Sequence, residues 1–63
     1  MEKAIVVKEL IRLGYDAREE RGVVVVLCPD RSMDMRIFTE SVLDAFSEMG
    51  YSDSWRCKYE KIL

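Results

Sequence analysis

Three acidic residues, Glu40, Asp44 and Glu48, recur at four-residue steps in a segment with helical patterning. Residues four apart lie on the same face of a helix, so this spacing predicts an acidic stripe. Like charges at this spacing repel, and no Lys or Arg follows to offset them. The stripe is interpreted either as a solvated helix surface or as a surface that docks on a basic partner, and its three residues are candidate partner-binding residues.

Basic and aromatic residues are interleaved near the C-terminus, in the order Trp55, Arg56, Lys58, Tyr59 and Lys61. Proteins that bind single-stranded nucleic acid combine such residues. In a strand, however, alternation places Trp55 and Tyr59 on the face opposite Arg56 and Lys58. The net charge of −2 also argues against broad electrostatic binding to nucleic acid. Arg56 and Lys58 are nevertheless candidate partner-binding residues, and a nucleic-acid-binding module is the alternative function.

The residue types that catalysis and metal binding need are scarce. The chain has no histidine, which removes the commonest general base and a common zinc ligand. Its three glycines are explained as turns or caps rather than as a phosphate loop. Cys28 and Cys57 form no CxxC pair and are interpreted as reduced thiols, against the alternative of a disulfide or a reactive thiol. The sequence predicts no catalytic residue, no cofactor and no metal.

The element that must organise these residues is Val23–Leu27, five apolar residues in a row. β-Branched residues favour a strand, and the absence of alternation predicts a central strand that is covered on both faces. Two helices account for one face. We expect half of the valines to be exposed on the other, unless a dimer mate, a partner chain or the long side chains of Arg18, Arg56 and Lys58 cover them.

The first half of the chain predicts a helix and a hairpin. Glu2–Leu13 has helical periodicity and ends at Gly14, and its expected buried face carries Ala4, Val7, Leu10 and Ile11. A polar edge strand follows, and a turn at Gly22 leads into the central strand, so that the two form an antiparallel hairpin over Tyr15–Arg21 and Val23–Cys28.

Residues 30–50 permit two interpretations. In the first, Asp30 or Ser32 caps a long helix that ends at Gly50, with an apolar stripe of Met35, Phe38, Val42, Ala45 and Met49. In the second, Met33–Phe38 is a strand and Thr39 caps a shorter helix. The continuous stripe favours the long helix.

The last strand is expected over Trp55–Ile62, parallel to the central strand through a right-handed crossover. The predicted fold is therefore a single α+β domain over residues 1–63, in the order helix–strand–strand–helix–strand. Its three-stranded mixed sheet carries two helices packed on one face. No apolar run approaches the roughly 20 residues of a membrane span, and no signal peptide is recognised, so a soluble cytoplasmic protein is expected.

The helix, Gly14–Tyr15, the valine strand, Glu48-Met49-Gly50-Tyr51 and Ser54-Trp55-Arg56 together resemble small uncharacterised proteins of bacterial prophages and mobile elements. The resemblance implies a small accessory protein and assigns no functional residue. A helix followed by a hairpin is also similar to double-stranded-RNA-binding-like toxins of toxin–antitoxin systems. Those toxins rely on a histidine, which this chain lacks.

These observations favour a non-catalytic protein-interaction module, a small regulatory or accessory protein encoded by a phage or mobile element. The expected partner is a protein or a second copy bound through the open sheet face, or a basic protein bound to the acidic stripe. No membrane is expected as a partner.

Overall fold

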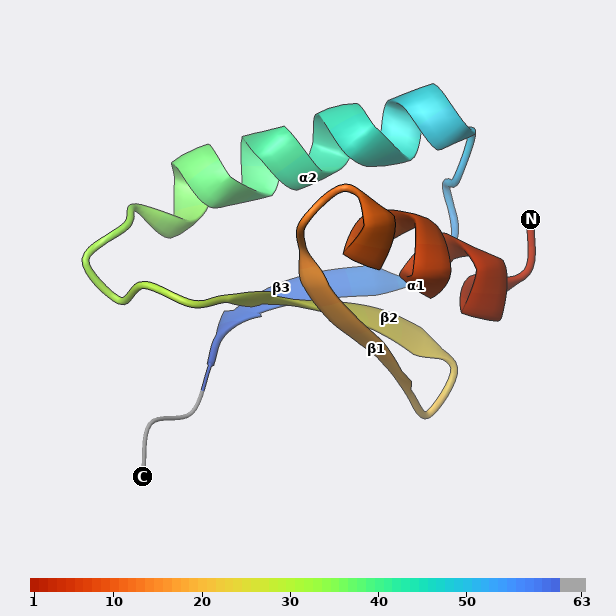
Figure 1. Ribbon diagram of the computed structural model, residues 1–63, viewed down its shortest axis with the longest axis horizontal. Coiled ribbons are helices and arrows are strands. Elements are labelled where there is room, and N and C mark those ends of the chain that lie inside the picture. The colour runs from red at the N-terminus through yellow and green to blue at the C-terminus, as the bar shows by residue number, and fades with distance from the viewer. Residues whose placement is uncertain (61–63) are drawn as a thin grey trace.

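The computed structural model describes residues 1–60 and contains two helices and three strands (Figure 1). In chain order the elements are α1 (Lys3–Arg12), β1 (Asp16–Glu20), β2 (Val23–Cys28), α2 (Met35–Met49) and β3 (Trp55–Tyr59). Both helices lie on the same side of the sheet (Figure 1). The α+β fold and the order of its elements are as predicted.

The sheet has the strand order β1-β2-β3, so the valine strand is central. β1 and β2 pair antiparallel, with Ala17 opposite Val26. β2 and β3 pair parallel, with Val26 beside Cys57. The parallel pair requires a crossover, and α2 supplies it over the sheet (Figure 1). The predicted hairpin and mixed sheet are both confirmed.

The core lies between the sheet and the helices. Side chains from all five elements and from Tyr51 meet there, and the fully buried members include Val6, Leu10, Val24 and Phe46. Trp55, Cys57 and Tyr59 of β3 pack against this core, as the alternation predicted. The strand is described to Tyr59, and the remainder of the expected span, including Lys61, lies outside the described residues.

The buried face of α1 differs from the expected one. Val6 and Leu10 are buried, whereas Ala4 and Ile11 are exposed, and Ile11 keeps 54% of its surface. Apolar residues occur almost all round this helix, so periodicity does not select one face. Packing against β1 and β2 makes the choice instead, and it leaves several apolar side chains of α1 in solvent.

The long-helix interpretation of residues 30–50 is confirmed, and the strand over Met33–Phe38 is wrong. The cap is neither Asp30 nor Ser32: the Asp34 carboxylate accepts a hydrogen bond from the Arg36 backbone N–H, at 2.9 Å. Asp30 instead accepts bonds from the backbone N–H and hydroxyl of Ser32, which makes a turn before the helix. α2 ends at Gly50, whose left-handed φ of 74° suits a residue without a Cβ.

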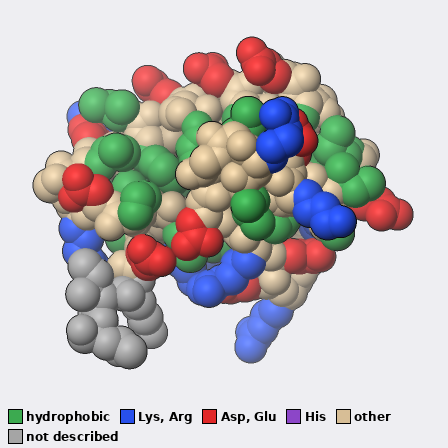
Figure 2. Space-filling view, viewed as in Figure 1, with side chains coloured by type: hydrophobic (Ala, Val, Ile, Leu, Met, Phe, Trp, Pro, Cys, Tyr) green, Lys and Arg blue, Asp and Glu red, His purple; other side chains and the backbone are tan. Residues whose placement is uncertain are grey.

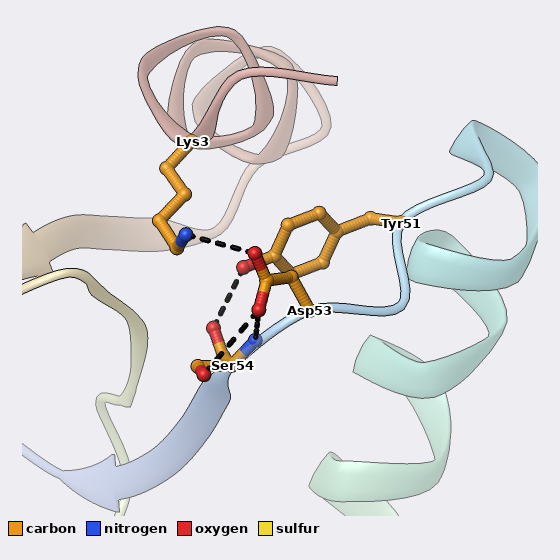
Figure 3. A network of polar contacts seen from close by, with 4 residues as sticks. All are labelled: Lys3, Tyr51, Asp53 and Ser54. Carbon is orange, nitrogen blue, oxygen red and sulfur yellow. Dashed lines mark hydrogen bonds and ion pairs between the residues drawn. The ribbon is translucent and has the colours of Figure 1, made fainter.

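A small polar network joins the start of α1 to the loop before β3 (Figure 3). Lys3 Nζ lies 2.9 Å from Asp53 Oδ2, and the other oxygen of Asp53 accepts the backbone N–H of Ser54 at 2.8 Å. The Tyr51 hydroxyl donates to the Ser54 carbonyl oxygen at 2.7 Å. The network thereby ties together segments 50 residues apart in the chain.

We expect Asp53→Asn to reduce the loss of stability in acid. The hydrogen bond from Lys3 lowers the pKa of Asp53 below its usual 3.8. A lowered pKa adds stability above the unfolded value, and this is lost as the pH falls through the folded value. Urea unfolding of the variant should therefore change less between pH 5 and pH 3 than that of the wild type. Asp44→Asn, which removes the same charge without breaking an ion pair, is the control, and equal acid sensitivity in Asp53→Asn and the wild type would refute the expectation.

Candidate functional site

The sheet face opposite the helices is already covered by the chain itself. Val25 and Leu27 point to this face, yet they keep only 1% and 7% of their surface exposed. Arg18 and Arg56 flank Val25 in the strand register, and Lys58 flanks Leu27. The aliphatic parts of long charged side chains can shield apolar surface in this way. The expectation of an exposed valine face is therefore wrong, because the flanking strands supply its cover.

The charges on this face are mixed in sign. Arg18 forms an ion pair with Glu20, and Lys58 Nζ lies 3.5 Å from the same carboxylate. Burial raises the pKa of Glu20, but the hydrogen bond and charge of Arg18 and the charge of Lys58 outweigh it and lower that pKa. Half of the basic groups here are thus engaged by an acid of the same sheet, which weakens an attraction for phosphate.

An apolar groove lies where β2 leads into α2. Its volume is about 540 Å³, and its lining is mainly apolar. Ile37 and Met33 are the most exposed hydrophobic residues in it, at 64% and 40%. Hydrophobic side chains gather over this end of the molecule in Figure 2, at its left. The lining residues are Gly14, Tyr15, Asp16, Leu27, Pro29, Met33, Ile37, Phe38 and Ser41.

Specific contacts hold the walls of this groove in place. The Tyr15 ring meets Phe38 edge to face, with centroids 5.9 Å apart, and its hydroxyl shares a hydrogen bond with Ser41. On the other wall, the Tyr59 hydroxyl donates to the Met33 carbonyl oxygen at 2.8 Å. β1, α2 and β3 therefore all contribute to the shape, and the groove is formed before any partner arrives.

The predicted acidic stripe is present on α2. Glu40, Asp44 and Glu48 are exposed, and acidic side chains line the upper edge of the molecule over this helix in Figure 2. Within residues 1–60, none of the three forms an ion pair. The candidate residues Arg56 and Lys58 point to the opposite face of the molecule, because they alternate with the core-facing residues of β3. The five candidate residues thus belong to two surfaces.

Sequence reasoning missed the groove residues Tyr15, Met33 and Ile37 as a site. Tyr15 was expected to face the core, and Met33 was placed on a helix or a strand. The one signal available was Ile37, which falls outside the apolar stripe of α2. An apolar residue off the core stripe is a candidate surface contact.

The described residues offer little for catalysis. Residues 1–60 contain no group of three His, Cys, Asp or Glu side chains that could hold a metal ion. Both cysteines are free thiols, and Cys28 is buried. Burial raises the pKa of the Cys57 thiol, which keeps it protonated at neutral pH and weakens it as a nucleophile. The site with the clearest physical purpose is therefore the apolar groove, which can take up apolar side chains.

Comparison with protein-family models, with curated proteins and with solved structures gave no match. The resemblance to prophage and mobile-element proteins therefore stays a prediction. Neither α1 nor α2, the helices within residues 1–60, is long and apolar enough to cross a membrane.

Proposed function

We propose that this protein is a non-catalytic protein-interaction module that binds a segment of a partner protein in the groove between β2 and α2. The observation that carries the proposal is the exposure of Ile37 and Met33 on walls that Tyr15 and Tyr59 hold in place. Elsewhere, on the sheet face, the apolar residues are already shielded. A regulatory or accessory role of the kind expected from the sequence is consistent with such a module.

The energetic case for binding rests on apolar surface. Full burial of an Ile or Met side chain is worth about 1.5–3 kcal/mol. Ile37 and Met33 retain a large part of that free energy in the unbound protein because much of their surface is still in water. The groove walls need little rearrangement, so less of the gain is lost to ordering side chains on binding.

Ile37→Asp should abolish binding of peptides selected for this protein. A random peptide library displayed on phage would be selected on the wild type, and the enriched peptides measured by titration. Removing the apolar anchor and placing a charge in the groove should weaken binding by about tenfold or more. Stability should change little, since Ile37 is 64% exposed.

Leu43→Asp is the matched control, because Leu43 is an exposed apolar residue of the same helix outside the groove lining. Its binding should equal that of the wild type. Arg56→Glu with Lys58→Glu tests the sheet face, and this pair should also bind normally. If the selected peptides depend on Arg56 and Lys58 and not on Ile37, the proposal is wrong and the sheet face is the binding surface.

A further inference from the structure

One flank of α2 has the spacing of a helix–helix seam. Ile37, Ser41, Asp44 and Glu48 follow one another at steps of four, three and four residues. These steps repeat every seven residues, the period at which one helix keeps contact with another along its length. None of the four is buried, so this flank is free of the core.

The two ends of this flank border two hollows. Ile37 and Ser41 line the apolar groove, and Glu48 lines a second, smaller hollow of about 190 Å³ that it shares with Leu13 of the α1–β1 turn. Leu13 keeps 48% of its surface exposed. Gly14 and Tyr15, which follow it, line the apolar groove. The flank of α2 is therefore continuous with both hollows over about three turns of helix.

The charge on this flank calls for a basic partner. Asp44 and Glu48 lie on the seam, and Glu40 lies next to it; within residues 1–60 none of these carboxylates forms an ion pair. The one basic residue of α2 is Arg36, which pairs with Asp34 at 3.4 Å. Acidic side chains without a local counter-charge attract Lys and Arg of an approaching molecule.

We propose that the occupant is a basic amphipathic helix of a partner protein, laid along this flank of α2. The inference rests on the proposed function and names its partner class. The partner helix presents an apolar residue to Ile37 and the groove, and Lys or Arg residues to Asp44 and Glu48. These positions lie seven and eleven residues along α2 from Ile37, so the apolar and basic residues of the partner follow the same spacing.

A pair of synthetic peptides tests this partner class. Each is a labelled helix of about five turns with Leu at the seam positions of one end. The first carries Lys at the seam positions of the other end, and the second carries Glu there. Fluorescence anisotropy with the full chain should show that the Lys peptide binds more tightly, and that high salt reduces this preference.

Asp44→Lys with Glu48→Lys should reverse the preference. Replacing two attractive pairs by repulsive ones should weaken the Lys peptide by about tenfold and strengthen the Glu peptide. Glu2→Lys with Glu19→Lys changes the net charge equally at exposed positions away from the seam, and should leave the preference for the Lys peptide in place.

The outcomes separate the two proposals. If both peptides bind equally, or neither binds although library peptides do so through Ile37, the basic-helix inference is overturned and the groove function stands. If Ile37→Asp leaves every peptide bound as in the wild type, the groove function itself fails. Reversal of the preference by the Lys variants supports both.

Discussion

Replacing Phe46 with Ala is expected to leave the protein largely unfolded at 25 °C. Phe46 is 2% exposed and lies at the centre of an aromatic cluster. Its ring centroid is 5.2 Å from that of Tyr51 and 5.2 Å from that of Trp55. Truncation removes the contacts that hold α2 to β3 and to the loop between them. Such Phe→Ala substitutions cost about 3–5 kcal/mol.

That cost is comparable to the whole stability of a domain of this length, which is about 5 kcal/mol. Urea unfolding followed by far-UV circular dichroism and by the fluorescence of Trp55 measures it directly. Leu43→Ala is the control on the same helix, because Leu43 is 45% exposed and should lose little. A Phe46→Ala variant as stable as the Leu43→Ala variant would show that the aromatic cluster does not hold the helix to the sheet.

Val25→Ala should destabilise the protein by about 2 kcal/mol. Val25 belongs to the sheet face that carries no helix, yet only 1% of its surface is exposed. Two methyl groups are lost from beneath Arg18 and Arg56, and the long side chains above cannot fully close over the gap. A shift of the urea midpoint without a change in slope is the expected observation.

Val23→Ala is the matched control for this substitution. Val23 lies two residues earlier on the same strand and the same face, and it is only partly buried. Its truncation should cost clearly less. Equal costs at Val23 and Val25, both small, would mean that the charged side chains do not cover the sheet, and that the face is open to a dimer mate as the sequence alone led us to expect.

The sequence predicts the central strand, the hairpin and the second helix because each has an unambiguous local signal. Val23–Leu27 lacks alternation, Gly22 marks a turn, and a stripe from Met35 to Met49 runs without interruption. The orientation of α1 is not predictable in this way. Its apolar residues surround the helix, so only the packing against β1 and β2 decides which of them are buried.

The candidate site divides along the same line. The acidic stripe follows from spacing within one helix, and it is present as predicted. The groove depends on Tyr15, Met33 and Ile37, which come from three parts of the chain and meet only after the sheet has formed. The cover over Val25 likewise depends on the register between strands, which brings Arg18 and Arg56 to the same residue.

Mapping a bound peptide onto the protein tests the central claim most directly. A library-selected peptide would be titrated into ¹⁵N-labelled protein, and the backbone amide shifts followed by NMR. Docking in the groove predicts the largest shifts at Met33, Ile37 and Ser41, with little change along β3. Largest shifts at Val25, Arg56 and Lys58 would contradict the account, because they would place the binding surface on the opposite face of the sheet.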